Sequence, residues 1–311
     1  SPSCHHLVVL KMHNAGSTWF AEQLNLIHGV HVIHQLLQSG NEHPQSADEA
    51  VGVMVKYALA ACPNGIVLNG YTQRVAVGSR GASDKLSNVS YARLQQLPGV
   101  TYATWTRSNV VARAVSMERD IASACDQHNF HQHNDDLTSK SNKDLLECLE
   151  ARHKSHRPNL LRLIRESACD RSYTMNIARS LTPPSAPPHD IVYENFVRDA
   201  DGELIALFNL LGMPTSAILR RHNSTIAKRT SANLASHLTN NETVRDWLQE
   251  WSPPDISLLQ MFDDTEYMSY GGVEQASALC SHADRLMAAE GVPWQTWSEM
   301  KDAALAQKLY E

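Results

Sequence analysis

Short apolar runs alternate along this chain with segments in which apolar residues recur every three or four positions. The first run, Leu7 to Leu10, is rich in Val and ends at a turn that contains Gly16. Such a run is typical of a parallel strand that is buried on both faces. Apolar residues at helical spacing follow from Trp19 to Ile27. The chain is therefore predicted to open with a strand, a tight turn and a helix.

The same alternation predicts the elements that follow. Strands are expected at 66–68, 100–106 and 189–196, and helices at 46–61, 83–97, from about 109, across 141–181 and at 199–212. A capping box, Ser46 to Glu49, opens the first of these helices, and Gly212 ends the last. The Pro-rich segment 183–188 and the polar segment 222–233 are expected to be loops, and further helices are expected at 241–251, 274–289 and 294–309.

Strands that alternate with helices imply a parallel sheet with right-handed crossovers. We therefore predict an α/β fold, a three-layer sandwich with a central parallel sheet, a P-loop-like phosphate-binding turn after the first strand and a helical C-terminal part. One domain is expected over residues 1–311, with a core at about 6–250 and a helical extension at about 251–311.

The net charge argues against a general nucleic-acid binder, and the hydropathy argues against a membrane-spanning helix. The formal net charge is -6, whereas a general nucleic-acid binder needs an excess of Lys and Arg. No window approaches the roughly eighteen uninterrupted apolar residues of a membrane helix. We expect no nucleic-acid partner and no membrane span in this chain, and the oligomeric state is left open.

The six cysteines are spread along the chain without a CxxC pair, which argues against a zinc ribbon. Their even number permits disulfides, and sequons for N-glycosylation begin at Asn88, Asn223 and Asn241. These features favour a secretory compartment such as the Golgi lumen over the cytoplasm.

The turn "HNAGSTW" at 13–19 has the features of an anion site. A helix N-terminus presents free N–H groups and a partial positive charge, and Gly16 lets the backbone approach an anion closely. Nucleotide triphosphatases require a Lys directly before the Ser/Thr of such a loop, and here that residue is Gly16. The GxGxxG pattern of dinucleotide-binding folds is also missing.

The loop resembles the 5′-phosphosulfate loop of sulfotransferases, which use 3′-phosphoadenosine 5′-phosphosulfate (PAPS). Their loop reads Lys/Arg-x-Gly-(Ser/Thr)-(Ser/Thr), often followed by Trp, and Asn14 stands at the basic position here. The longer pattern, which includes Lys11 and His13, is similar to the loop of galactose-type carbohydrate sulfotransferases.

Three later segments are similar to the same family, in the family's order. "YATWTRSNVVARAVS" at 102–116 resembles its 3′-phosphate motif, with Arg107 and Ser116 at the binding positions. "IVYENFVRDADGELIALFNLLGMP" at 191–214 resembles a structural strand and helix. The segment 225–248 resembles the late basic loop, with Lys228 and Arg229 as its cations.

The resemblance implies transfer of a sulfuryl group from PAPS to a hydroxyl or amine of a small-molecule or glycan acceptor, leaving 3′,5′-bisphosphoadenosine (PAP). No metal is required, and the His-rich segment 125–133 is interpreted as an exposed or acceptor-facing loop. The residues expected to bind the donor are Asn14, Ala15, Gly16, Ser17, Thr18, Trp19, Arg107, Ser116, Lys228 and Arg229.

Two catalytic roles are left with alternatives. Asn14 cannot supply the cation that usually stabilises the developing charge, so Lys11, His13 or Lys228 would have to do so, and we favour Lys11. The base that takes the acceptor proton is either Glu22 or His34.

Other interpretations compete with this one. A P-loop kinase would need ATP and Mg²⁺, and a non-catalytic member would keep the nucleotide fold without turnover. Each motif also has a purely structural interpretation: Gly16 as a turn that caps a helix, Arg107 as a surface residue at a strand end, Ser116 as a buried helix serine, and Lys228 and Arg229 as parts of a solvated loop.

Overall fold

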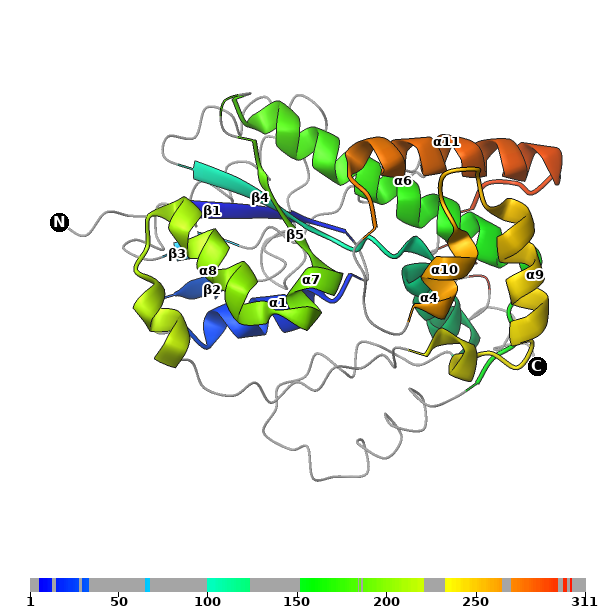
Figure 1. Ribbon diagram of the computed structural model, residues 1–311, viewed down its shortest axis with the longest axis horizontal. Coiled ribbons are helices and arrows are strands. Elements are labelled where there is room, and N and C mark those ends of the chain that lie inside the picture. The colour runs from blue at the N-terminus through cyan, green and yellow to red at the C-terminus, as the bar shows by residue number, and fades with distance from the viewer. Residues whose placement is uncertain are drawn as a thin grey trace. The chain divides into compact units, whose positions relative to one another are not determined.

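The computed structural model (Figure 1) describes residues 6–12, 15–27, 30–33, 65–67, 100–123, 152–183, 185, 187–220, 233–264, 270–295, 299–300 and 303. The helices expected at 46–61 and 83–97 lie outside these ranges. The chain forms two compact units. Unit 1 consists of residues 1–108, 170–228 and 267–276, and unit 2 of residues 109–169, 229–266 and 277–311. The expectation of one domain stays a prediction.

Unit 1 contains a five-stranded parallel sheet with the order β2-β3-β1-β4-β5. Its strands are β1 (His6–Lys11), β2 (His31–Ile33), β3 (Gly65–Val67), β4 (Val100–Thr106) and β5 (His189–Val192). The predicted α/β fold with a parallel sheet is confirmed, and the first strand and the strands near 66 and 100 lie where the apolar runs placed them. Strand β2, which is three residues long, was not predicted.

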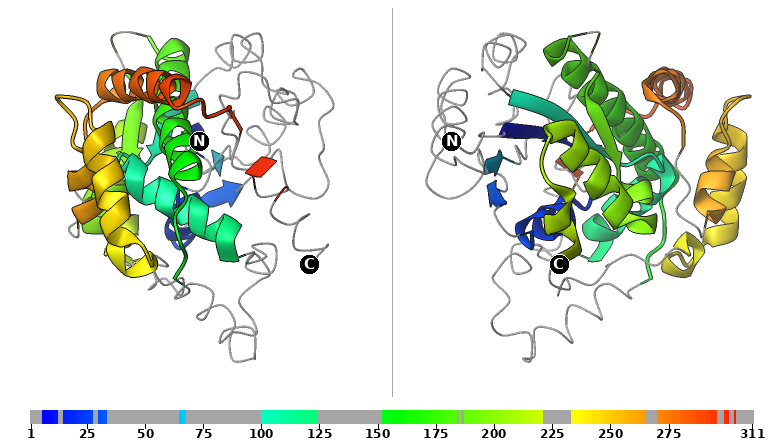
Figure 2. Two further views of the ribbon diagram at one scale, coloured as in Figure 1. Left: turned by 90° about the vertical axis from the view of Figure 1, so that its right-hand side faces the viewer. Right: turned by 60° about the vertical axis from the view of Figure 1, so that its left-hand side comes forward.

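One face of the sheet carries the apolar core of unit 1. It is covered by α1 (Ser17–Asn25), α7 (Tyr193–Arg198) and α8 (Ala200–Leu211), which lie together in both Figure 1 and Figure 2. The 3₁₀ helix η4 (Thr215–Arg220) adds Ile218 to this core. Alternate strand residues point into the core, and those of β1 are Leu7 and Val9. Helix α8 ends at Gly212 as predicted, with φ 67°.

The other face of the sheet is polar next to β5. Thr104 and Thr106 both donate their hydroxyls to Asp190 Oδ1, at 2.5 and 2.9 Å. Burial lowers the pKa of Arg171, and the nearby carboxylates of Asp190 and Glu194 oppose the shift. Because Arg171 belongs to α6 (Arg157–Leu181), this helix covers the second face, and helices lie on both sides of the sheet.

The strand predicted at 189–196 is wrong in its second half. Strand β5 ends at Val192, and residues 193–198 form α7. Tyr193 and Phe196 are both buried, at 6% and 0% exposure. Residues three apart share a face in a helix but lie on opposite faces of a strand, so only the helix places both rings in one core.

Unit 2 is helical. It contains α4 (Val110–Ser123), the first half of α6, η5 (Leu234–His237), α9 (Asn241–Trp251), α10 (Leu258–Asp263) and most of α11 (Val273–Ala289). Helices α4, α9 and α11 confirm the helices expected from about 109, at 241–251 and at 274–289. None of the helices in the described ranges is long and apolar enough to cross a membrane.

Two predicted helix boundaries in unit 2 are wrong. Residues 152–156 are not helical, because His153 forms a parallel bridge with Leu238, and α6 begins at Arg157. Residues 292–295 are not helical either, so the helix expected from 294 does not begin there. Gly291, with φ 65°, follows α11, and the Arg165 guanidinium lies 4.0 Å from the Trp294 ring centre.

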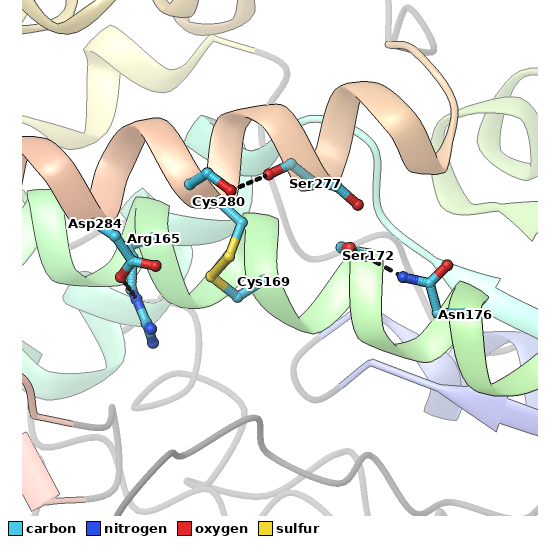
Figure 3. The surroundings of a disulfide bond; sticks show 8 residues. Arg165, Cys169, Ser172, Asn176, Ser277, Cys280 and Asp284 are labelled. Carbon is cyan, nitrogen blue, oxygen red and sulfur yellow. Dashed lines mark hydrogen bonds and ion pairs between the residues drawn. A yellow bond between two sulfur atoms is a disulfide. The ribbon is translucent and has the colours of Figure 1, made fainter.

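A disulfide joins α6 to α11 within unit 2. Figure 3 shows Cys169 of α6 bonded to Cys280 of α11, two cysteines that lie 111 residues apart in the sequence. One turn before Cys169 in α6 and one turn after Cys280 in α11, Arg165 Nε lies 2.6 Å from Asp284 Oδ1. The sequence allowed disulfides but did not predict this pair.

Candidate functional site

Gly16 forms the turn between β1 and α1 under two separate restrictions. Its φ of 75° lies in the left-handed region, which residues with a side chain rarely adopt. A Cβ atom at this position would also lie 2.8 Å from Cε2 of Tyr193. The turn therefore requires Gly16, and its backbone packs directly against an aromatic ring.

The residue before Gly16 is held by the neighbouring strand. Trp105 of β4 donates its indole N–H to the carbonyl of Ala15 at 2.8 Å, and both residues are fully buried. The Trp105 ring stacks on Phe20 of α1, with 4.4 Å between the ring centres. The Trp105 side chain and its stacking partner Phe20 therefore hold the loop backbone in place without a ligand.

Lys11 contacts the loop from the end of β1. It has the same parity as Leu7 and Val9, so its side chain points toward α1, where Nζ donates to Ser17 Oγ at 2.9 Å. Lys11 is 7% exposed, and burial lowers its pKa to about 7. An oxyanion next to Nζ would favour the charged form again. Lys11 is therefore positioned to supply positive charge at the loop, where Asn14 has none.

Arg107 follows β4 and is buried, at 4% exposure. The alternative interpretation of Arg107 as a surface residue at a strand end is therefore wrong. Its guanidinium carbon lies 4.8 Å from the centre of the Tyr193 ring, and its backbone N–H donates to Met12 Sδ at 3.3 Å. The buried Nε has no hydrogen-bond partner in the described part of the chain. A buried donor without a partner is costly, and a ligand oxyanion would satisfy it.

Glu194 lies beside Arg107 at the end of β5. Its Oε1 is 3.5 Å from Arg107 Nε, and its Oε2 accepts from both the N–H and the hydroxyl of Ser108 at 2.9 Å. The Ser108 hydroxyl in turn accepts from the N–H of Tyr270 at 3.0 Å. Burial of a carboxylate is tolerated where a cation and hydrogen bonds surround it, as here.

The Tyr193 ring connects the two halves of the site. One part of the ring faces Gly16 and the guanidinium of Arg107 lies over it. The sequence predicts no role in the site for Tyr193 or Glu194, because the segment 191–214 resembles a structural strand and helix. A usable signal exists, since the carboxyl ends of parallel strands meet at one edge of a sheet, and Arg107 and Glu194 both follow such ends.

The structure brings some of the predicted site residues together and does not show a site role for others. The residues brought together lie at or next to the turn between β1 and α1 in unit 1: Lys11, Ala15, Gly16, Ser17, Trp19 and Arg107. The Trp19 ring packs edge-on against Phe196, with 5.1 Å between the ring centres, and the Trp19 N–H donates to the Gly16 carbonyl at 3.1 Å. Glu22 is half-buried on α1, and of Thr18 the structure describes only the backbone, in the first turn of α1.

Other predicted residues cannot be added to this group. Ser116 is half-buried on α4 in unit 2 and is described there alone. His13, Asn14, His34, Lys228 and Arg229 lie outside the described residues. Their roles stay predictions, as does the choice between Glu22 and His34.

No protein-family profile and no curated protein sequence matches this chain. Solved structures with a similar fold include a sulfotransferase from Alicyclobacillus acidocaldarius, with 11% identity over 83% of this chain and 95% of that one and a TM-score of 0.42. They also include a sulfotransferase domain from the curacin biosynthetic pathway, with 13% identity over 95% and 100% of the two chains and a TM-score of 0.38. The chain is thus similar to sulfotransferases of known structure, at an identity and a TM-score too low to assign it an activity or a ligand.

Proposed function

We propose that this protein is a PAPS-dependent sulfotransferase that transfers a sulfuryl group to a hydroxyl or amine of an acceptor, a carbohydrate or another alcohol, and releases PAP. The observation that carries the proposal is the shared Tyr193 ring, which joins an anion-type turn at Gly16 to the buried cation Arg107. A ligand that spans both halves needs two separate anionic groups. PAPS has this feature, with a 5′-phosphosulfate and a 3′-phosphate.

Each half of the site suits one of these groups. The N–H groups at the very start of a helix lack a partner in a preceding turn, which at α1 applies to Ser17 and Thr18, whereas the Trp19 N–H already donates to the Gly16 carbonyl at 3.1 Å. The Ser17 hydroxyl and the Lys11 ammonium lie beside them. This end would hold the 5′-phosphosulfate. Arg107 presents a planar, permanently charged fork whose Nε makes no hydrogen bond in the described part of the chain, which suits the 3′-phosphate.

PAPS would supply the activated sulfuryl group, and the chain would supply position and charge. Backbone N–H groups at 15–19 and the Lys11 ammonium would stabilise negative charge that develops on the leaving phosphate. A positioned Glu22 or His34 would take the acceptor proton. No metal is assigned to this chemistry.

The disulfide supports a related proposal about where the protein works. Disulfides persist in oxidising compartments and are rare in the cytosol. Cys169 and Cys280 are bonded between two helices, which favours the secretory pathway, such as the Golgi lumen.

Calorimetric titration of the purified protein with PAP, AMP, and ATP with Mg²⁺ tests the donor. PAP contains AMP plus the 3′-phosphate, so the pair isolates the Arg107 half of the site. We expect PAP to bind at least about tenfold more tightly than AMP, the scale of one hydrogen bond to a charged group. Tighter binding of ATP with Mg²⁺ than of PAP would instead support a kinase.

Turnover requires a second measurement. Incubation with PAPS and a panel of sugars, alcohols and amines should release PAP with at least one acceptor. Binding of PAP without turnover on any acceptor would favour a non-catalytic nucleotide-binding protein.

A further inference from the structure

We infer that Glu194 is a positioning residue of the donor site, whose carboxylate holds the Arg107 guanidinium in the orientation that receives the 3′-phosphate. This inference rests on the proposed function. It assigns to Glu194 a role that differs from that of the phosphate-contacting residues, because a carboxylate does not itself bind a phosphate and would act through Arg107.

The surroundings of Glu194 fix its carboxylate firmly. The residue is 1% exposed, and Oε2 receives two hydrogen bonds of 2.9 Å from the N–H and the hydroxyl of Ser108. Ser108 is tied further by Tyr270, whose N–H donates to the same hydroxyl. The other oxygen, Oε1, faces Arg107.

The contact between Glu194 and Arg107 is close enough to orient the guanidinium but does not satisfy it. Oε1 and Nε are 3.5 Å apart, which is an ion-pair distance, and Nε makes no hydrogen bond to any residue that the structure describes. The Tyr193 ring restricts the same guanidinium from its face, with 4.8 Å between the guanidinium carbon and the ring centre. The Glu194 carboxylate therefore restrains one edge of the Arg107 guanidinium, and the Tyr193 ring restrains one face. The guanidinium can still donate hydrogen bonds to an oxyanion.

Both restraints come from the first turn of one short helix. Tyr193 and Glu194 are the first two residues of α7, directly after β5. A guanidinium that is oriented in advance loses less conformational entropy when the phosphate binds. Without the carboxylate, Arg107 would have to be ordered by the ligand, and the 3′-phosphate would add less affinity.

Glu194→Gln separates this role from a structural one. Gln has the same shape, and its amide oxygen can still accept both hydrogen bonds from Ser108. The amide nitrogen then faces Arg107 Nε, so two donors oppose each other and the attraction between the charges is lost. The matched control is Asp190→Asn, which removes a carboxylate from the neighbouring β5, where Asp190 binds Thr104 and Thr106 instead of Arg107.

The experiment measures dissociation constants for PAP and AMP by calorimetry, together with thermal unfolding of each variant. The ratio of the AMP constant to the PAP constant reports the 3′-phosphate alone. We expect Glu194→Gln to lower this ratio by about tenfold, with AMP affinity within about twofold of the wild type, and Asp190→Asn to leave it unchanged. In an Arg107→Ala background, Glu194→Gln should have no further effect.

The outcomes distinguish the two proposals. A wild-type ratio near one would overturn both the PAPS assignment and this inference. A high wild-type ratio that Glu194→Gln leaves intact would overturn the inference alone, as would an equal loss in the Arg107→Ala background. If Glu194→Gln fails to fold, Ser108→Ala takes its place, because it releases one of the bonds that hold Oε2; an unchanged ratio there counts against the inference and a loss of about threefold supports it.

Discussion

Gly16 offers the sharpest test at the scale of single residues, because the chain contains a matched control. Gly212 has nearly the same φ, 67° against 75°, but a Cβ there would meet nothing within 4 Å. Gly16→Ala and Gly212→Ala should both lose about 1–2 kcal/mol of unfolding free energy from the left-handed backbone. Gly16→Ala should lose more, since its methyl group would lie 2.8 Å from the Tyr193 ring, and only this variant should bind PAP more weakly.

Urea denaturation and calorimetry measure the two effects. Equal losses of stability in both variants would mean that the ring of Tyr193 yields to a methyl group. The close contact between the loop and the ring would then not constrain the site.

Lys11 should make the free energy of unfolding depend on pH between pH 7 and 9, where an ordinary lysine does not titrate. Burial lowers its pKa to about 7 in the folded protein, from an ordinary 10.5. Between these values the unfolded chain binds a proton that the native protein lacks, so the free energy of unfolding rises with pH. Relative to Lys11→Met, the wild type should gain up to about 1.4 kcal/mol per pH unit from pH 7 to 9. Urea denaturation of both proteins at pH 7, 8 and 9 gives this difference, and a constant difference would contradict the lowered pKa of Lys11.

The residues of the candidate site that are close together in the sequence could be predicted from it. Gly16, Ser17 and Lys11 lie within one turn and its strand, and Arg107 matched a motif of its own. Tyr193 and Glu194 were missed because their contacts are long-range: Ser108 and Glu194, for example, are 86 residues apart. Nothing in "YENF" itself says that its first two side chains restrain a distant arginine.

At the scale of elements, the indole N–H of Trp105 couples β4 to the loop before α1. Trp105→Phe would keep an aromatic ring on Phe20 but leave the buried carbonyl of Ala15 without a donor. We expect a loss of about 1–3 kcal/mol of unfolding free energy and a weaker affinity for PAP. Trp251→Phe is the control, because it removes a similar bond, from Nε1 to Glu290 in unit 2. Urea denaturation and calorimetric titration with PAP are carried out on both variants. Equal PAP affinities of Trp105→Phe and Trp251→Phe would show that the Trp105 indole N–H does not affect the loop before α1.

Element types were predictable where the apolar pattern had one periodicity. The strands β1 and β4 and the helices α8, α9 and α11 follow directly from it. The pattern failed at 193–198, where the run from Ile191 to Phe196 fits a strand as well as a helix. Packing of Tyr193 and Phe196 against Trp105 decided for the helix, and that information lies outside the segment.

At the scale of the whole molecule, the disulfide is the longest-range covalent constraint within the described residues. Because it closes a loop of 111 residues, Cys169→Ala with Cys280→Ala should lower the free energy of unfolding by about 2–5 kcal/mol. Wild-type protein treated with a thiol reductant should lose a similar amount in denaturation experiments. Peptide mapping without reduction should recover the two cysteines as one cross-linked pair, and a different pairing would contradict the structure.

The disulfide between Cys169 and Cys280 can form only after most of the chain has been synthesised. At roughly 5–20 residues per second, the ribosome delivers Cys280 about 6–20 s after Cys169. Four other cysteines, Cys4, Cys62, Cys125 and Cys148, are synthesised before Cys169 and are available to it earlier. The correct partner of Cys169 is therefore the last to appear, and native pairing depends on thiol exchange that can undo a premature bond. A host that only oxidises cysteines would accumulate the wrong isomer, whereas one with a disulfide isomerase would let the arrival of α11 decide the pairing.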